Sequence, residues 1–396
     1  MLKQLFNKES ILKVLSAKDI WRWKIIDQFG DCERAAKHIS VLWQKSGINI
    51  QPLRTISVKG KVAYRAQSLE DTLALKLVDR YVRRIYKVRQ SDRNRMVKQL
   101  ITRLKDPGEF TFIRFDIKSC YENINFRNML TKLKDDLILS PTCIKVLEQA
   151  VELTKSTGQS GLPRGLPISA TIAELYLETL DMELAQNENI IYSARYVDDY
   201  IVVTPSSEAS KTQDFINRTL DKLKLALNED KSSVYQIDQV NDSIELLGYC
   251  LTSKRRSAKP NNVVVTISEK KIKKIKTRII LSLLDYKQAN TISRFKLLKD
   301  RMYYLSTLRV VKKGKNGYLL AGNAYNYSLA GDLSCLKKID KFYHGLILRN
   351  QNIFSSPELV ALREISFYGN AKSKKTMKLT KNKSSRIQQV WSSKNE

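Results

Sequence analysis

Residues 195–203 read Arg-Tyr-Val-Asp-Asp-Tyr-Ile-Val-Val. The residues from 190 to 203 are typical of two strands, and Tyr196-Val-Asp-Asp199 lies at the turn between them. Adjacent carboxylates between apolar strands are costly unless a cation neutralises them. The stretch therefore predicts a hairpin whose turn presents Asp198 and Asp199 to a cation.

A third carboxylate stands at the end of another predicted strand. Residues 110–117 alternate and are rich in Phe and Ile, which indicates a buried strand that ends at Asp116 and turns into a helix. One sheet could then present all three carboxylates at one edge, with the backbone carbonyl of Ile117 as a further ligand. Mg²⁺ prefers such oxygen ligands, and two Mg²⁺ ions about 3.5–4 Å apart can catalyse the attack of a 3′-hydroxyl on an α-phosphate.

The charge balance favours a polyanionic partner. The 396 residues include 70 Lys and Arg against 40 Asp and Glu, a formal net charge of +30, and basic surface attracts nucleic acid. A ribosome-associated or membrane-surface protein is the alternative that this charge leaves open. No apolar run approaches the roughly 20 residues of a membrane span, and the N-terminus carries charges where a signal peptide is apolar. We therefore expect a cytoplasmic protein without membrane association.

Other residue types offer little chemistry. With 42% hydrophobic residues the chain can form one large body or two to three subdomains. The five cysteines are scattered without the spacing of paired metal ligands, which indicates reduced core residues. The only histidines are His38 and His344, so a zinc site or histidine acid–base catalysis has little material. Carboxylates must carry the chemistry.

The first part of the chain reads as helices around a basic hairpin. A β-rich pair around Gly60 predicts the hairpin, and a long helical segment is expected from about residue 69 to residue 104. Amphipathic helices that serve packing are predicted over residues 1 to about 50, with an apolar face formed by Trp21, Trp23, Ile25, Ile26 and Phe29.

The later part changes from mixed structure to basic helices. A Gly/Pro-rich loop precedes a helix at 169–184, and a helix near 209–227 is followed by strands at 233–237 and 244–252. A basic helix begins near Ser268 with a single apolar stripe. Residues 371–396 are polar and lysine-rich, which predicts a flexible tail.

Five segments resemble the successive palm motifs of reverse transcriptases, in that family's order and approximate spacing. They are FDIKSCYENI at 115–124, GLPRGLPISATIAELY at 161–176, RYVDDYIVV at 195–203, LALNEDKSS at 225–233 and ELLGYCLT at 245–252. Five ordered motifs make coincidence remote. The resemblance covers about residues 50–260, and more faintly the basic helices that follow.

The resemblance implies an α+β right-hand polymerase fold, with fingers, a palm of antiparallel sheet plus helices, and a helical basic thumb. The expected divisions are an N-terminal helical segment at 1–50, fingers at 51–110, palm at 111–258, helical thumb or C-terminal domain at 259–370 and a basic flexible tail at 371–396.

The resemblance also implies roles for the acidic residues and their neighbours. Asp116 and Asp198 would bind both metals, with Asp199 completing the acidic turn. Lys231 matches a lysine that protonates the departing pyrophosphate. Tyr121 matches an aromatic residue that lies under the sugar and excludes a 2′-hydroxyl; the alternative for Tyr121 is an ordinary packed aromatic.

Further positions match residues that contact nucleotide or nucleic acid. Arg65 resembles a fingers arginine that binds the incoming triphosphate. The alternative is that Arg65, Lys59 and Lys61 are solvated charges on an exposed hairpin. The expected nucleotide-binding set is Lys59, Lys61, Arg65, Tyr121, Gly165 and Ser169, and the expected primer- or template-binding set is Leu247, Gly248, Tyr249, Lys270, Lys273 and Lys274. Two positions depart from many relatives, since Arg164 replaces Gln and Ala170 replaces Pro.

The implied activity is RNA-directed DNA polymerisation with two Mg²⁺ ions, for which Mn²⁺ can substitute. The implied partners are an RNA template, dNTPs and a DNA product. Similarity to defence-associated prokaryotic enzymes, related to the abortive-infection and retron groups, adds an antiphage role, a structured non-coding RNA and a second polymerase subunit or homo-oligomer. An RNA-dependent RNA polymerase, or a non-catalytic RNA-binding protein on a palm scaffold, are the alternatives; the aromatic Tyr121 argues against the first and the complete acid set against the second.

Overall fold

The computed structural model describes residues 3–58, 60–89, 91–155, 161–236, 243–254, 262–289, 291–314, 317–322, 325, 328–379 and 381–392. The chain forms two compact units. The first unit comprises Met1–Asp92 and Phe110–Val234, and the second comprises Arg93–Glu109 and Tyr235–Glu396. Residues 93–109, which the sequence grouped with the fingers, thus belong with the C-terminal part of the chain.

The first unit begins with four helices, in the segment for which the sequence predicted helices. Their bounds are α1 Lys8–Val14, α2 Ala17–Arg22, α3 Ile25–Phe29 and α4 Cys32–Ser46. Asn7 and Asp31 cap α1 and α4 by accepting backbone N–H groups. The expected apolar face is only partly buried, because Ile25 is fully buried whereas Trp21 is 76% exposed.

A basic hairpin and helix α5 follow. The hairpin consists of β1 Arg54–Val58 and β2 Lys61–Arg65, and helix α5 spans Leu69–Ile85. The single helix expected up to residue 104 is instead two helices, α5 and α6 Arg93–Leu104. The chain leaves the helical path at Lys87, whose φ of 53° is left-handed. The second helix belongs to the other unit.

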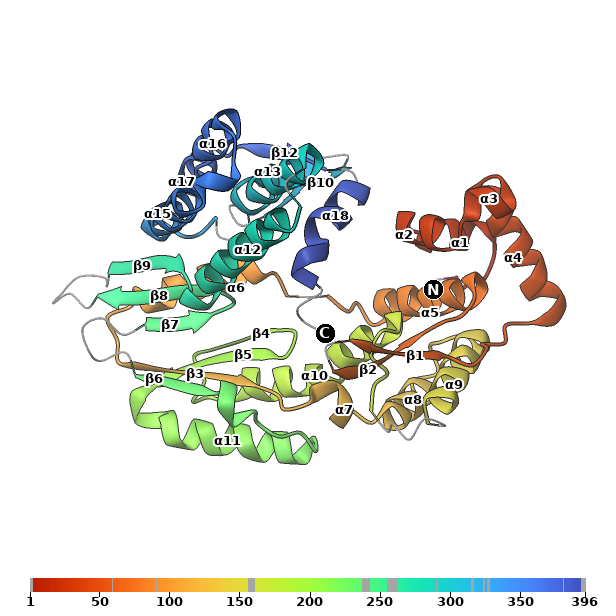
Figure 1. Ribbon diagram of the computed structural model, residues 1–396. Helices are drawn as coiled ribbons and strands as arrows, with labels where there is room; N and C mark the ends of the chain where they lie inside the picture. Colours follow the sequence, from red (N-terminus) through yellow and green to blue (C-terminus); the bar gives the residue numbers. More distant parts are fainter. Residues whose placement is uncertain are drawn as a thin grey trace. The chain divides into compact units, whose positions relative to one another are not determined.

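A four-stranded sheet forms the centre of the first unit, with the strand order β4-β5-β3-β6 (Figure 1). Its strands are β3 Phe110–Asp116, β4 Tyr192–Tyr196, β5 Asp199–Pro205 and β6 Ser233–Gln236. The stacked rings of Phe115 and Tyr200, 4.7 Å apart and fully buried, hold β3 against β5. The surrounding helices are α7 Cys120–Asn123, α8 Phe126–Asp135, α9 Pro141–Lys155, α10 Pro167–Gln186 and α11 Ala209–Lys222.

The second unit combines two three-stranded sheets with helices. The first sheet contains β7 Ser243–Leu246, β8 Tyr249–Lys254 and β9 Asn262–Ile267, and the second contains β10 Leu308–Gly314, β11 Gly317–Ala321 and β12 Thr376–Lys378. Besides α6, the helices given by the described residues of this unit are α12 Glu269–Lys287, α13 Ile292–Ser306, α15 Ser334–Arg349, α16 Ser356–Arg363, α17 Phe367–Lys372 and α18 Lys381–Ser392. Within the described ranges, no helix combines the length and apolar character needed to cross a membrane.

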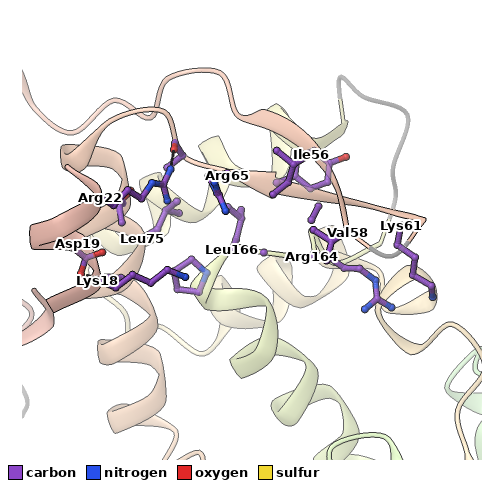
Figure 2. A pocket seen from close by; sticks show the side chains of 17 residues that line it. Lys18, Asp19, Arg22, Ile56, Val58, Lys61, Arg65, Leu75, Arg164 and Leu166 are labelled. Carbon is purple, nitrogen blue, oxygen red and sulfur yellow. Dashed lines mark hydrogen bonds and ion pairs between the residues drawn. The ribbon is translucent and has the colours of Figure 1, made fainter. Parts of the chain in front are cut away.

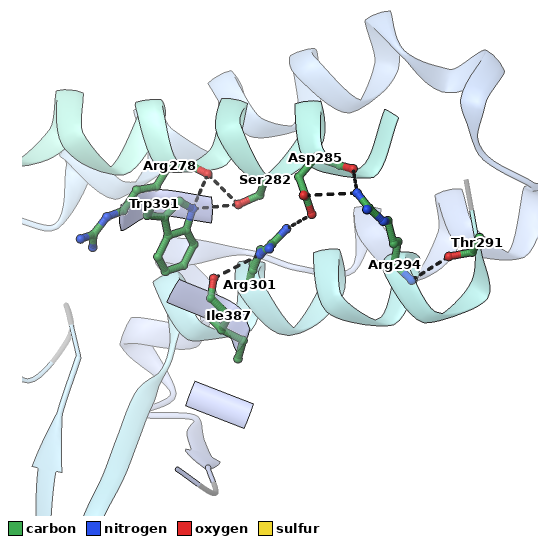
Figure 3. A network of polar contacts seen from close by, with 8 residues as sticks. All are labelled: Arg278, Ser282, Asp285, Thr291, Arg294, Arg301, Ile387 and Trp391. Carbon is green, nitrogen blue, oxygen red and sulfur yellow. Dashed lines mark hydrogen bonds and ion pairs between the residues drawn. The ribbon is translucent and has the colours of Figure 1, made fainter. Parts of the chain in front are cut away.

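Helix α18 corrects the expectation of a flexible tail, since most of that segment is helical and packed. The indole N–H of Trp391 donates to the Arg278 carbonyl and the Ser282 hydroxyl of α12, each at 3.1 Å. Arg301 of α13 donates to the Ile387 carbonyl at 3.2 Å and to Asp285 at 2.5 Å (Figure 3). The lysine-rich composition concealed this helix because its stability comes from packing rather than from its own sequence.

Arg301 should therefore be a main support of the second unit. Its side chain is only 4% exposed, so Arg301→Ala removes the donor to the Ile387 carbonyl and leaves the Asp285 carboxylate with Arg294 alone, at 3.3 Å. We expect the free energy of unfolding to fall by about 3 kcal/mol in urea titrations followed by circular dichroism. The exposed Lys296→Ala on the same helix is the control, and equal stability of the two variants would contradict the assignment.

Candidate active site

The turn between β4 and β5 consists of two residues, because Tyr196 pairs with Asp199. One of them, Val197, has a φ of 64°, which is unusual for a β-branched residue and stores strain. Buried Arg195 anchors the turn by donating to the Val197 carbonyl at 3.1 Å and pairing with Asp181 and Glu174. The second turn residue, Asp198, is thereby held in a fixed position.

Asp116 ends β3 opposite Asp199, as the sequence predicted. Its carboxylate accepts from Lys231 at 2.8 Å and from the Asn228 side chain at 3.0 Å. Lys231 belongs to a short 3-10 turn, Glu229–Lys231, and its hydrogen bond to Asp116 raises the pKa of its ammonium group. The lysine therefore stays charged beside the carboxylate.

Asp198 and Asp116 repel each other. Burial, followed by the nearby Asp116 charge, raises the pKa of Asp198. A divalent cation between them would remove this repulsion, and carboxylate oxygens suit Mg²⁺. The two residues therefore fit a metal site.

The Ile117 carbonyl is available as a third oxygen. Ile117 faces Leu227 in an isolated antiparallel bridge whose hydrogen bonds run from Lys118 N to Ala226 O at 2.9 Å and from Asn228 N to Asp116 O at 2.8 Å. The bridge therefore does not use the Ile117 carbonyl. Its expected role as a ligand stays compatible with the geometry.

Asp199 departs from the expectation that all three carboxylates converge. Its two oxygens accept from Arg114 at 2.9 and 3.0 Å in a bidentate pair. Among the described residues, no three acidic, histidine or cysteine side chains are grouped so as to hold a metal. The register brings Asp199 next to Asp116, but Arg114 holds its carboxylate.

Two glycines let the loop at 161–167 approach its neighbours. A Cβ on Gly161 would lie 2.5 Å from the Glu122 carbonyl oxygen, and one on Gly165, whose φ is 93°, would lie 2.5 Å from that of Tyr64. Backbone hydrogen bonds from Leu162 to Tyr121 at 2.7 Å and from Tyr64 to Arg164 at 2.6 Å complete these contacts. The loop thus joins α7 to the hairpin strand β2.

Arg164 links Tyr121 to this loop. Its guanidinium lies 4.9 Å from the Tyr121 ring centroid and forms a bidentate pair with Glu122 at 2.9 and 3.0 Å. Lys61 of β2 also reaches Glu122, at 3.3 Å. Hydrogen bonds from Arg164 hold the pKa of Glu122 at about 2. Glu122 was not predicted as a site residue; the one available signal was the unusual Arg164.

The structure places the remaining residues of the expected nucleotide-binding set in different surroundings. Ser169 is buried and donates to the Pro163 carbonyl at 2.6 Å, so it holds the loop rather than facing a nucleotide. Lys61 and Arg65 lie on β2 and line one cavity. Lys59 lies outside the described residues.

The expected primer contacts lie in the second unit. Leu247 and Gly248 form the β7–β8 turn with φ values of 51° and 84°. Arg93 of α6 donates to the Leu247 carbonyl at 3.1 Å and stacks over the Tyr249 ring, with 4.9 Å to its centroid. Tyr249 is buried, which makes it a support of this turn.

Helix α12 has the predicted apolar stripe, but two of its cations pack against aromatic rings. Its apolar stripe is buried, and Lys270, Lys273 and Lys274 are exposed. Two other cations do not face outward, because Lys276 lies over Phe342 and Arg278 over Trp391. The exposed basic face of α12 therefore does not include all the cations of this helix.

The Glu122–Arg164 pair predicts a pH-dependent stability. Because the pKa of Glu122 in the folded protein lies below the ordinary value of about 4.5, the pair stabilises the protein fully above about pH 4.5, and this stabilisation is lost as the pH falls towards about 2. The difference in thermal midpoint between wild type and Glu122→Gln should therefore shrink as the pH is lowered from about 6 to about 3. The exposed Glu188→Gln should show no such trend, and a constant difference for Glu122→Gln would contradict the pairing.

The family described as "Reverse transcriptase (RNA-dependent DNA polymerase)" matches residues 51–251. The retron Ec73 reverse transcriptase of Escherichia coli is 28% identical over 140 residues, which are 33% of this chain and 44% of the relative. The chain thus matches less than half the length of this curated relative.

Solved telomerase structures show a more distant likeness. Apo telomerase from Candida tropicalis has a TM-score of 0.39 at 12% identity, covering 87% of this chain and 66% of that one. Telomerase from Candida albicans with a fragment of telomeric RNA has a TM-score of 0.34 at 15% identity, covering 80% and 53%. The family match over residues 51–251 covers half of the chain. The chain therefore belongs to the reverse transcriptase family, with its right-hand polymerase fold of mixed helix and antiparallel sheet.

Proposed function

We propose that this protein is an RNA-directed DNA polymerase that adds dNTPs to a 3′-hydroxyl on an RNA template. The observation that carries the proposal is the convergence of Asp116 and Asp198, two mutually repelling carboxylates at one edge of the four-stranded sheet. Bound metal ions would offset the unfavourable electrostatic free energy of placing these two carboxylates close together. Membership of the reverse transcriptase family supports the same reaction.

Asp116, Asp198 and the Ile117 carbonyl would hold two Mg²⁺ ions, with Mn²⁺ as a substitute. Bound there, the metals would supply charge neutralisation and activation of the attacking hydroxyl. Asn228 orients the Asp116 carboxylate through its hydrogen bond at 3.0 Å. We place Asp199 in a supporting role, in which its pair with Arg114 fixes the first residue of β5.

Lys231 is the proposed proton donor for the departing pyrophosphate. Its ammonium lies 2.8 Å from Asp116, and its side chain is 60% exposed, so it can also reach a phosphate oxygen beside that carboxylate. An ammonium both neutralises the leaving group and can protonate it.

Nucleotide selection is assigned to Tyr121 and the residues around it. Tyr121 is half-buried, and the Arg164 guanidinium covers one face of its ring. A fixed aromatic wall excludes the extra hydroxyl of a ribonucleotide by steric conflict. Lys61, with Lys59 and Arg65 as further candidates, would bind phosphate, and Gly165 permits the close approach of the loop.

Nucleic acid would be held by the exposed Lys270, Lys273 and Lys274 of α12 and by the turn at Leu247 and Gly248. We further propose an antiphage role in the cytoplasm with a structured non-coding RNA, and with a second polymerase subunit or a second copy of the chain. The similarity to a retron reverse transcriptase and the net charge of +30 support this setting.

Replacement of either central carboxylate should abolish synthesis. Asp116→Ala and Asp198→Ala should each lower dNTP incorporation with Mg²⁺ by about a thousandfold or more, because losing a metal removes several kcal/mol of transition-state stabilisation. RNA affinity should change little, since the basic surface remains. Asp214→Ala on α11, an exposed acid, is the control. Activity within about tenfold of wild type in either carboxylate variant would overturn the metal assignment.

Truncation of Tyr121 should relax sugar selection. In Tyr121→Val the steric wall is removed, so the ratio of ribonucleotide to deoxynucleotide incorporation should rise more than the dNTP rate falls. Parallel single-nucleotide incorporation assays measure both quantities. An unchanged ratio would return Tyr121 to an ordinary packing role, and efficient ribonucleotide use by the wild type would favour an RNA polymerase instead.

A further inference from the structure

Glu122 follows Tyr121 directly in the chain and accepts hydrogen bonds from two cations. Its carboxylate forms the bidentate pair with Arg164, at 2.9 and 3.0 Å, and its Oε1 also lies 3.3 Å from the ammonium of Lys61. Figure 2 shows the charged ends of Lys61 and Arg164 close together, at one end of a cavity beside the β1–β2 hairpin. A single carboxylate therefore fixes one cation of the hairpin and one of the loop at 161–167.

Tyr121, Glu122 and the loop form a closed ring of contacts. The Tyr121 carbonyl accepts the backbone N–H of Leu162 at 2.7 Å, and the Arg164 guanidinium returns to lie over the Tyr121 ring. The close approach depends on Gly161, on which a Cβ would lie 2.5 Å from the Glu122 carbonyl oxygen. Glu122 closes the ring of contacts by holding that guanidinium. The backbone of Tyr121 and the cover of its side chain are thus fixed by the same segment.

The contact with the aromatic ring alone would hold Arg164 only weakly. Its side chain is 33% exposed, and a cation–π contact at an exposed site is a weak interaction. An arginine side chain also has several rotatable bonds, so ordering it costs conformational entropy. The two parallel hydrogen bonds to Glu122 fix both the position and the orientation of the guanidinium plane. Glu122 therefore determines whether the guanidinium stays over the ring.

The covered ring lies near the proposed metal site. Burial is the main cause that raises the pKa of Tyr121, and the charge of Asp198 adds to this rise. Hydrogen bonding to Glu122 chiefly raises the pKa of Arg164, and the Asp198 charge contributes there as well. Both side chains are therefore within electrostatic range of a carboxylate that would hold a metal ion.

We propose that Glu122 is a positioning residue for sugar selection, which holds the Arg164 guanidinium against the Tyr121 ring and so fixes this ring as a wall. The inference rests on the proposed function of Tyr121. Arg164 stands where many relatives have Gln, and a neutral glutamine could form neither this ion pair nor a cation–π contact. Sugar selection in this chain thus depends on an ion pair, the clamp formed by Glu122 and Arg164.

The test is the ratio of kcat/KM for a ribonucleotide to that for the matching deoxynucleotide, measured by single-nucleotide incorporation on a primed RNA oligonucleotide with Mg²⁺. In Glu122→Gln the clamp is lost, so the ratio should rise about two- to fivefold, less than in Tyr121→Val, where the wall itself is removed. Arg164→Gln should raise the ratio to the same extent as Glu122→Gln. An unchanged ratio in Glu122→Gln would overturn the proposal.

Lys61→Gln is the matched control, because it removes the other cation that Glu122 holds and leaves the clamp intact. Any change in kcat/KM should be the same for both nucleotides, since their triphosphates are identical, so the ratio should stay at the wild-type value. A ratio raised as much in Lys61→Gln as in Glu122→Gln would contradict the clamp. An equal loss of kcat for both nucleotides in Glu122→Gln would show a purely structural role.

A double variant shows whether Glu122 acts through Tyr121. In the Tyr121→Val background no aromatic ring remains to be held, so adding Glu122→Gln should leave the ratio of Tyr121→Val unchanged. Independent effects would instead multiply. A further rise of the ratio in the double variant would therefore exclude action through Tyr121.

The position of the ring can also be followed without any catalytic activity. A 3-fluorotyrosine at position 121 of the full chain gives a fluorine NMR signal that senses the guanidinium over the ring. This signal should move in the same direction in Glu122→Gln and Arg164→Gln, and it should stay in place in Lys61→Gln.

The two measurements together separate this inference from the proposed function. If the fluorine signal moves as expected but Tyr121→Val leaves the nucleotide ratio unchanged, the sugar-selecting role of Tyr121 fails, whereas its positioning by Glu122 stands. If Tyr121→Val changes the ratio but the signal does not move in Glu122→Gln, the inference about Glu122 alone is overturned.

Discussion

The antiparallel pairing of β3 with β5 sets the position of the carboxylates in the candidate active site. It places Asp116 opposite Asp199, and the two-residue turn before β5 then brings Asp198 close enough for the Asp116 charge to raise its pKa. The stacked rings of Phe115 and Tyr200 hold the same pair of strands from the buried side. A shift of one residue would turn the carboxylates to the opposite face of the sheet.

The loop at 161–167 connects helix α7 to the β1–β2 hairpin through backbone contacts. Its glycines permit backbone contacts with α7 on one side and with β2 on the other, at distances that no Cβ would allow. Arg164, between these contacts, ties Tyr121 and Glu122 to the loop. The wall proposed to select the sugar is therefore supported by the same segment that contacts the β1–β2 hairpin.

The sequence predicted those features that depend on local pattern. Alternation located the hairpin at Asp198 and the strand ending at Asp116, because neighbouring residues determine them. The pair between Arg114 and Asp199 could not be predicted, since it depends on the side-chain geometry across two strands that are far apart in the chain. Glu122 was missed for the same reason, as its partner Arg164 arrives from a distant loop. Helix α18 was taken for a tail because packing of Trp391, rather than helix propensity, stabilises it.

Helix α6 is separated in sequence from the rest of the unit in which it packs. Residues 93–109 join the second unit, yet residues 110–234 that follow return to the first. Its buried residues Met96, Val97 and Leu100 are therefore synthesised well before the β7–β8 turn that Arg93 contacts. During synthesis, the residues of the first unit are complete while α6 still lacks its packing partners. The apolar face of this helix therefore stays exposed until the C-terminal part of the chain has been synthesised.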